Sequence, residues 1–315
     1  MSAFSTGTPA VAVRGLTKSY GSTRAVHGIS FEVATGEVFA LLGPNGAGKS
    51  TTVEILEGHR SADSGEVSVL GFDPAVAGRE FRDRIGIVLQ ESTVDTSEMT
   101  VAEALDTFGA AYRRPRDRDE VIELVGLAGK TDARLKTLSG GQQRRIDMAL
   151  GLIGDPDLLF LDEPTTGFDP EARRAAWEMI KGLGSLGRTI ILTTHYMEEA
   201  EYLADRVAVL VDGRIVACAP PSQLLGVEQS TVRFRLPAGT APADLPALVA
   251  AAVEVEGDFA VVNTECPTTL LAELTGWAVG QMIELAELTV SPPSLEDAYL
   301  QLIGTDGDGD GDDAG

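Results

Sequence analysis

The sequence predicts an α/β fold centred on a mostly parallel β-sheet, followed by a small α+β domain. Continuous apolar runs, without the alternation of a half-exposed strand, occur at Val38–Leu42, Leu158–Leu161 and Ile190–Leu192. Strands of a parallel sheet are buried on both faces and lose that alternation. A second observation is the glycine-rich loop that follows the first run and leads into a helical stretch, Lys49–Leu56. The third is a change after Pro220-Pro221, where apolar and charged residues begin to alternate.

Length and composition are those of a globular protein with about two domains. The 315 residues are 43% hydrophobic and 23% charged, which allows a sizeable core. No apolar run approaches the ~18 residues that cross a bilayer, and Met1–Ala10 has neither the basic nor the apolar segment of a signal peptide. We therefore expect a cytoplasmic protein without direct membrane insertion. Any work at a membrane must then go through a separately encoded subunit.

The charge balance argues against nucleic acid as a partner. The formal net charge is −23, and part of it lies near the C-terminus, at Asp306, Asp308, Asp310, Asp312 and Asp313. Phosphate backbones and anionic lipids repel such a surface. The acid-rich, lysine-poor composition fits a GC-rich genome or a salt-rich cytoplasm, where a short Debye length weakens repulsion between carboxylates. Cys218 and Cys266 have no metal-like spacing and are expected to be reduced thiols.

The elements of the first domain follow in chain order. Residues 1–10 are small and polar and are expected to be disordered. Strands are predicted at Val11–Val13, Ile29–Val33, Val38–Leu42, Ile85–Leu89, Leu158–Leu161 and Thr189–Thr193. Residues 98–150 lack strand signals and carry helical spacing, so they form a mainly helical insert. Asp212-Gly213 separates two further apolar runs and predicts a β-hairpin.

A different region starts near Gln229 and is predicted to form an α+β domain over residues 229–304. Val232 to Leu236 alternates like a half-exposed strand, and one helix face carries Leu270, Leu274 and Trp277. Ile283–Val290 resembles another strand, and Ser294 with Asp297 fits a helix-start capping pattern. The Asp-Gly repeat of residues 305–315 cannot bury apolar surface and is expected to be disordered.

A phosphate-binding P-loop stands between the Val38–Leu42 strand and its helix. It consists of Gly43, Pro44, Asn45, Gly46, Ala47, Gly48, Lys49 and Ser50, with Thr51 next in the helix. The glycines let backbone N–H groups point at phosphate oxygens, and the helix N-terminus adds partial positive charge. Lys49 is predicted to reach the β- and γ-phosphates, and Ser50 to offer its hydroxyl to Mg²⁺. This pattern by itself indicates a P-loop nucleoside triphosphatase.

The end of the Leu158–Leu161 strand supplies two carboxylates. A carboxylate at the tip of a buried strand beside a P-loop can hold Mg²⁺ through water, and Asp162 fits this position. Glu163, the next residue, can direct the attacking water as a general base. The alternative is that two surface acids merely end a strand.

The pentapeptide Leu138-Ser139-Gly140-Gly141-Gln142 lies between the P-loop and this acidic strand end. A serine and two glycines that open a helix can form a second site for phosphate oxygens. In this order, the motifs resemble those of the ATP-binding cassette (ABC) ATPases, and the pentapeptide resembles their signature motif. The resemblance covers residues 11–225 and implies a RecA-like core, an antiparallel β subdomain and a helical subdomain at about 91–150. It also implies ATP as the nucleotide and a homodimer in which each signature serves the ATP of a head-to-tail neighbour.

The resemblance assigns roles to further residues. Gln90 looks like the Q-loop residue, which contacts Mg²⁺ and water and faces the membrane subunit. His195 resembles the switch histidine that senses the γ-phosphate. Tyr20 resembles the aromatic residue that stacks on adenine, although a strand-end packing role stays open for it. Asp169 matches the D-loop aspartate at the dimer seam, whereas Phe168 departs from the family's usual leucine.

Pro293–Leu300 is similar to the C-terminal element of daunorubicin-resistance-like ATPases, although a generic amphipathic closing helix is the alternative. These ATPases usually pair with a separate permease as exporters. The resemblance implies a motor subunit on the cytoplasmic face of the membrane that drives export of a drug, antibiotic or lipid-like small molecule. A soluble cassette protein in translation or DNA maintenance is the competing class. A single cassette without a coiled coil between Gln90 and Ser139 disfavours it. Residues 229–304 could support the dimer or sense a ligand.

Overall fold

The computed structural model describes residues 8–90, 98–224, 230–237 and 239–291, together with residues 295, 296 and 299. The chain divides into two compact units, Met1–Pro221 and Ser222–Gly315. The predicted boundary lay slightly later, between residues 225 and 229. Each unit is described by itself below. Within the described residues, no helix is both long and apolar enough to cross a membrane.

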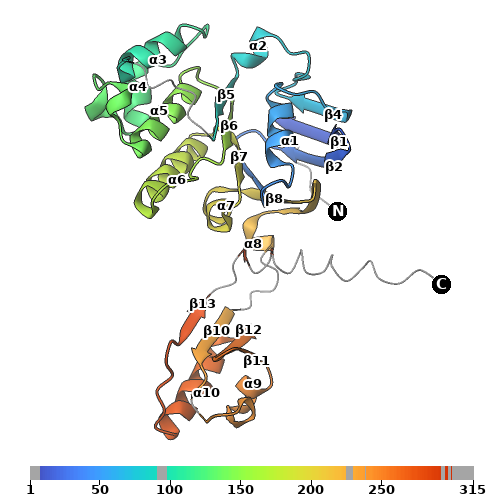
Figure 1. Ribbon diagram of the computed structural model, residues 1–315, viewed down its shortest axis with the longest axis vertical. Helices are drawn as coiled ribbons and strands as arrows, with labels where there is room; N and C mark the ends of the chain where they lie inside the picture. Colours follow the sequence, from blue (N-terminus) through green and yellow to red (C-terminus); the bar gives the residue numbers. More distant parts are fainter. Residues whose placement is uncertain are drawn as a thin grey trace, which may run out of the picture. The chain divides into compact units, whose positions relative to one another are not determined.

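The first unit is built on a six-stranded sheet with strand order β5-β6-β7-β3-β8-β9 (Figure 1). Its strands are β3 (Val38–Leu42), β5 (Ile85–Val88), β6 (Leu158–Asp162), β7 (Thr189–Thr194), β8 (Arg206–Val211) and β9 (Arg214–Ala219). All neighbours pair in parallel except β9, which forms the predicted hairpin with β8. Every residue of β3 is buried, which explains its unbroken apolar sequence. The predicted α/β fold class is confirmed.

A separate antiparallel sheet has the order β2-β1-β4, with β1 at Val11–Tyr20, β2 at Thr23–Val33 and β4 at Ser64–Val69. The predicted strands Val11–Val13 and Ile29–Val33 were too short. Gly15 and Gly28 adopt positive φ angles, and register shifts interrupt the pairing of β1 with β2, so the alternation in the sequence is broken. Phe31 stacks on Phe39 of β3 with a centroid separation of 5.3 Å and joins the two sheets in one core.

The N-terminal expectation needs a correction at its last residue. Ala10 is buried, and its N–H donates to the carbonyl of Val33 at 2.8 Å, because the chain there already lies against β2. Residue 10 is therefore part of the fold, and residues 1–7 lie outside the described residues.

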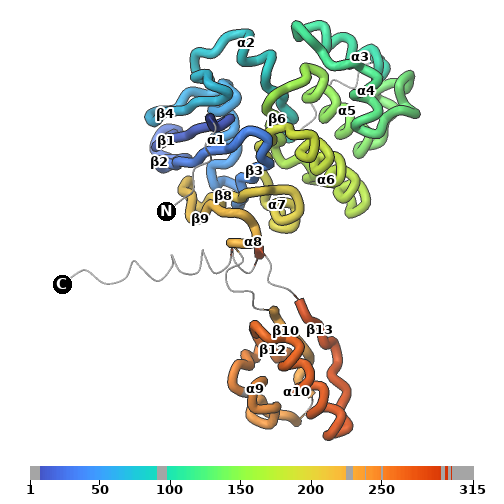
Figure 2. Tube along the Cα trace, turned by 180° about the vertical axis from the view of Figure 1, so that it is seen from behind, coloured from blue at the N-terminus to red at the C-terminus, as the bar shows by residue number. Residues whose placement is uncertain are grey.

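Helices occupy the segment between β5 and β6, as the lack of strand signals predicted. They are α3 (Val101–Gly109), α4 (Arg118–Leu124) and α5 (Gly140–Leu152), with short 3₁₀ turns at Ala128–Lys130 and Leu135–Thr137. Figures 1 and 2 show this helical group and the three-stranded sheet at opposite ends of the unit. The remaining helices are α1 (Lys49–Leu56), α2 (Arg79–Arg82), α6 (Pro170–Ser185) and α7 (Met197–Leu203).

The second unit is an antiparallel sheet with helices, as predicted, in the strand order β11-β12-β10-β13. Its elements are α8 (Pro221–Leu224) at the boundary, β10 (Ser230–Arg235), a 3₁₀ turn at Pro242–Asp244, α9 (Ala247–Ala250), β11 (Val253–Glu256), β12 (Phe259–Thr264), α10 (Pro267–Gly280) and β13 (Thr289–Ser291). Its core gathers Val232 and Phe234 of β10 with Leu270 and Leu274 of α10.

The predicted strand Ile283–Val290 is wrong for most of its length. Met282 and Glu287 both have φ of 56°, which interrupts extended backbone, and only Thr289–Ser291 pairs with β10. The helix-start pattern at Ser294 and Asp297 and the Asp-Gly repeat of residues 305–315 lie outside the described residues.

Candidate functional site

The P-loop turns from the end of β3 into the first turn of α1. A side chain at Gly43 would meet the carbonyl of Leu210 at 2.3 Å, and one at Gly48 the carbonyl of Ala25 at 2.5 Å. Gly48 also adopts φ of 99°, which L-residues rarely reach. Only glycine fits at these two positions, and the loop between them leaves Pro44 to Gly46 exposed above the N-terminus of α1. This arrangement is a backbone cradle suited to phosphate.

Lys49 lies buried beneath this loop. Its ammonium donates hydrogen bonds to the carbonyls of Gly43 at 2.7 Å and Pro44 at 3.1 Å, and lies 3.6 Å from Oε1 of Glu163. Burial lowers the pKa of Lys49, and the charge of Glu163 acts in the opposite direction. The lysine is therefore a desolvated cation that the chain itself neutralises only in part.

Three of the predicted site residues, Lys49, Gln90 and His195, converge on Glu163. Gln90 donates to its carboxylate at 3.2 Å, Thr166 donates at 3.1 Å, and Nδ1 of His195 lies 3.2 Å away. Its own backbone holds φ of 44° directly after β6, and its N–H donates to Oγ1 of Thr193 at 3.0 Å. Residues from four separate strand ends and loops thus meet around one carboxylate.

Asp162 lies one residue earlier, at the tip of β6. Burial raises its pKa, whereas a hydrogen bond donated by the Thr193 hydroxyl acts in the opposite direction. Among the described residues, no group of three or more His, Cys, Asp or Glu side chains could hold a metal ion by itself. The residues predicted to bind Mg²⁺, Asp162, Ser50 and Gln90, all carry oxygen donors. Such hard oxygen donors fit Mg²⁺, which keeps several waters and takes its other ligands from substrate phosphates.

The signature residues lie elsewhere in the unit. Ser139 is the N-cap of α5, and its backbone N–H donates to Oε1 of Gln142 at 3.1 Å. Ser139, Gly141, Gln142 and Asp169 line a hollow of about 540 Å³ between α5 and α6. No P-loop residue is among those that line it in the described part of the chain. The structure therefore does not place the signature against the chain's own P-loop.

Tyr20 and Asp169 have clear local surroundings. Tyr20 ends β1 with 41% of its surface exposed, and its ring centroid lies 5.8 Å from the Lys18 ammonium and 5.4 Å from the Arg60 guanidinium. An exposed aromatic face of this kind can accept a stacked base. Asp169 caps α6 by accepting hydrogen bonds from the backbone N–H groups of Glu171 and Ala172.

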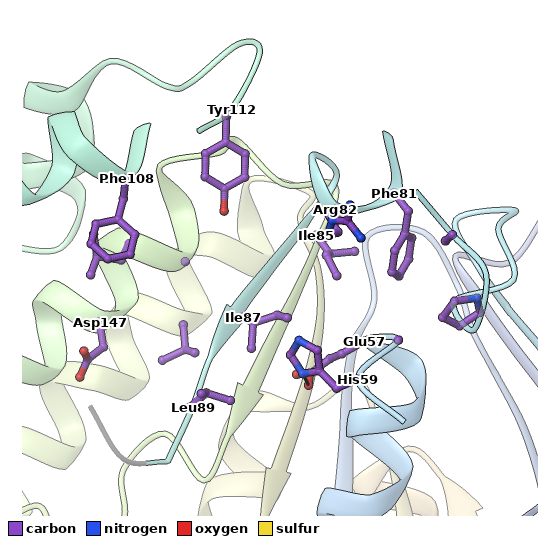
Figure 3. Close-up of a pocket in the computed structure, with 16 residues that line it drawn as sticks. Glu57, His59, Phe81, Arg82, Ile85, Ile87, Leu89, Phe108, Tyr112 and Asp147 are labelled. Atoms are coloured by element: carbon purple, nitrogen blue, oxygen red, sulfur yellow. Dashed lines mark ion pairs between the residues drawn. The ribbon is translucent and has the colours of Figure 1, made fainter. Parts of the chain in front are cut away.

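A groove that the sequence did not indicate runs along β5 between α2, α3 and α5. Figure 3 shows Phe81 on one side and Phe108 with Tyr112 on the other, with Ile87 of β5 between them. Its volume is about 410 Å³, and we call it the β5 groove. It ends beside Leu89, the neighbour of Gln90.

One titratable group in the β5 groove stands out. Burial raises the pKa of Glu57 to about 8, and the charges of Asp162 and Glu54 act in the same direction. Nδ1 of His59 lies 3.2 Å from its carboxylate. In the sequence Glu57 reads only as the end of a helix, so no signal identified it.

Comparisons with known proteins identify the family of the chain. A family model described as ABC transporter matches residues 26–166, and one for the C-terminal domain of ABC transporter domain-containing proteins matches residues 230–294. The chain is 42% identical to the Nod factor export ATP-binding protein I of Rhizobium meliloti strain 1021, over 94% of this chain and 89% of that protein. The protein of the same name from Ralstonia nicotianae is 38% identical, over 94% of each chain.

Solved structures give the same answer for the first unit. The protein cbiO1 of Clostridium perfringens, part of the ABC transporter complex cbiONQ, has 29% identity and a TM-score of 0.62, covering 69% of this chain and 90% of that one. The ATP-binding cassette MJ0796, solved as a dimer bound to ADP and phosphate, has 24% identity and a TM-score of 0.59, over 67% and 98% of the two chains. The second likeness bears on the fold alone.

The fold and the P-loop site define a nucleotide-binding ATPase of the ABC class. With relatives of this identity and coverage, the chain belongs to the family of ABC transporter ATP-binding proteins. It is an ATPase that binds adenine nucleotide.

Proposed function

We propose that the protein is the motor subunit of an ABC exporter and hydrolyses ATP with Mg²⁺ in a head-to-tail homodimer. The observation that carries the proposal is the convergence of Lys49, Gln90 and His195 on the Glu163 carboxylate beneath the P-loop. A carboxylate held at a strand end by an amide and a hydroxyl can orient and deprotonate a water beside the terminal phosphate.

Each residue then has a chemical task. The backbone of Gly43 to Gly48 and the ammonium of Lys49 bind the β- and γ-phosphates, and Tyr20 stacks on adenine. Thr51, in the first turn of α1, adds a contact to the phosphates. Glu163 is the general base, and His195 holds the γ-phosphate. Mg²⁺, when bound, offsets phosphate charge, and the residues that would hold it are Ser50, Gln90 and Asp162.

The dimer follows from where the signature lies. Ser139, Gly140, Gly141 and Gln142 open α5 at the hollow beside α6, away from the chain's own P-loop. The N-terminus of α5 can bind phosphate oxygens, but the chain's own P-loop does not lie beside it. The P-loop of a second copy of the chain would supply the phosphate. In that dimer Asp169 lies at the seam.

The membrane partner is a separately encoded permease, which places the protein on the cytoplasmic face of the membrane. The β5 groove, which mixes aromatic and charged side chains and includes Leu89, the neighbour of Gln90, is the surface that we assign to it. Export is supported by the names of the relatives, which are Nod factor export proteins. A drug, antibiotic or lipid-like molecule is the proposed cargo class, in line with the daunorubicin-resistance-like element at Pro293–Leu300.

An affinity capture tests this function. Tagged Glu163→Gln protein is incubated with detergent-solubilised native membranes and Mg-ATP, and the co-purified proteins are identified by mass spectrometry. We expect a stoichiometric integral membrane protein, enriched over a matched Lys49→Ala protein that cannot hold the nucleotide-bound state. Recovery of ribosomal or chromosomal proteins without a membrane partner would overturn the exporter assignment and favour a soluble cassette.

A further inference from the structure

One buried arginine donates hydrogen bonds to the backbone carbonyls on both sides of Glu163. Arg144 lies on α5, five residues after Ser139, and only 8% of its surface is exposed. Its guanidinium donates to the carbonyl of Asp162 at 3.3 Å and to that of Pro164 at 3.2 Å. A third bond goes to the carbonyl of Leu89. These carbonyls lie directly before or after Gln90 and Glu163 in the chain.

The helix that carries Arg144 is seated directly on β5. A side chain at Gly86 would meet the carbonyl of Gly151 at 2.1 Å, so two glycines let the helix and strand approach closely. A regular helix rises about 1.5 Å per residue, so Ser139 and Arg144 are joined by roughly 7.5 Å of rigid backbone. A displacement of the signature therefore moves the guanidinium with it.

Stability alone does not explain a charge in this position. Among the described residues, the carboxylate nearest to the guanidinium is that of Asp147, at 3.8 Å. Burial lowers the pKa of Arg144, whereas the charges of Asp147, Asp162 and Glu199 act in the opposite direction, and burying a guanidinium costs desolvation free energy. An apolar side chain would fill the space without that cost. The planar fork with five N–H donors, in contrast, can bind several carbonyls at fixed angles, which neither lysine nor an apolar residue can do.

We infer that Arg144 is a positioning residue that couples the signature helix to the catalytic backbone of its own chain. The inference rests on the proposed dimer, in which Ser139 contacts the neighbour's ATP. That contact fixes the position of the start of α5. Through its bonds to the carbonyls of Leu89, Asp162 and Pro164, Arg144 then fixes the backbone position of Gln90, Asp162 and Glu163. Occupancy of one ATP site thereby adjusts catalysis at the other, and the two sites hydrolyse ATP cooperatively.

Three variants of the full-length protein test this inference. Arg144→Met removes all three carbonyl bonds, whereas Arg144→Lys keeps the charge but not the fork. Arg145→Lys is the matched control, because Arg145 donates to the carbonyls of Val125 and Gly126, inside the helical group. ATP binding, turnover as a function of ATP concentration, ATP-dependent dimer formation and thermal stability are measured for each.

We expect wild type and Arg145→Lys to show a Hill coefficient approaching about 2, the number of sites in the dimer. In Arg144→Met and Arg144→Lys the coefficient should fall to about 1. Turnover should fall roughly ten- to a hundred-fold, because the catalytic groups are misplaced. The dissociation constant for ATP should change little, because Lys49 and the P-loop are unchanged. Arg144→Lys should keep the thermal stability of wild type, which a purely structural role would not combine with lost cooperativity.

Two different results would overturn the inference. An Arg144→Met protein that forms the ATP-dependent dimer and keeps the cooperativity of wild type would refute the role of Arg144 alone. A wild-type protein that stays monomeric with saturating Mg-ATP and hydrolyses it without cooperativity would refute the dimer, and the coupling with it.

Discussion

Replacing Glu163 with glutamine isolates the charge on which the site converges. The substitution keeps the size of the side chain, which Gln90 and Thr166 contact at 3.2 and 3.1 Å. It removes the base, so turnover should fall by about 10²–10⁴-fold, the usual contribution of a positioned general base. It also removes the carboxylate that lies 3.6 Å from the Lys49 ammonium. Both side chains of this pair are buried, with 5% of Lys49 and 9% of Glu163 exposed. The ammonium is then left for the phosphates, and ATP should bind at least as tightly as in wild type.

Two assays are needed, because loss of the fold would also abolish turnover. Phosphate release at saturating Mg-ATP gives the turnover, and equilibrium binding of a fluorescent ATP analogue gives the affinity. Glu201→Gln is the control, since Glu201 is an exposed acid on α7. Turnover within about tenfold of wild type would refute the assignment of the base. A clear loss of nucleotide affinity would refute the reasoning about Lys49.

Three further predictions concern the cradle, the groove and the second unit. Gly48→Ala should lose nucleotide binding, because its Cβ would lie 2.5 Å from the Ala25 carbonyl. Gly46 has a similar left-handed φ of 83°, but a Cβ there meets nothing within 4 Å, so Gly46→Ala should lose less; equal binding by both variants would contradict this. Because burial raises the pKa of Glu57 to about 8, wild type should lose stability as the pH rises from the ordinary carboxyl range toward 8. The free energy of unfolding of Glu57→Gln relative to wild type should therefore grow by roughly 3 kcal/mol between about pH 5 and 7.5, and a pH-independent difference in denaturant titrations would count against it. Phe234→Ala, at a fully buried position, should destabilise the second unit by about 3–5 kcal/mol, seen as faster amide exchange in β10; unchanged exchange would show that the position is not part of a packed core.

The parts of the fold that the sequence could predict are those with one unambiguous pattern. β3, β6 and β7 are buried on both faces, so their apolar runs identify them. β1 and β2 were predicted too short, because left-handed glycines and register shifts disturb their alternation. The strand at β13 was predicted too long for a similar reason, because the hydrophobic pattern does not indicate the positive φ at Glu287.

The candidate site divides in the same way. Contiguous residues such as Gly43 to Ser50 carry their chemistry in a local motif, and the positions of Asp162 and Glu163 follow from a strand end. Arg144 could not be recognised, because its partners are backbone carbonyls 18, 20 and 55 residues away. Every residue has a backbone carbonyl, so the sequence does not indicate which of them Arg144 contacts. Only the packing of α5 on β5 shows these contacts.

The most direct test of the central claim is a mixing experiment with two inactive variants. Lys49→Ala lacks the phosphate cation, and Ser139→Arg blocks the signature. In a head-to-tail dimer of the two, one site combines the intact Lys49 of one chain with the intact Ser139 of the other. We predict that the mixture hydrolyses ATP well above the sum of the separate proteins. If the mixture stays as inactive as its components while wild type is active, each chain uses its own signature, and the composite site is wrong.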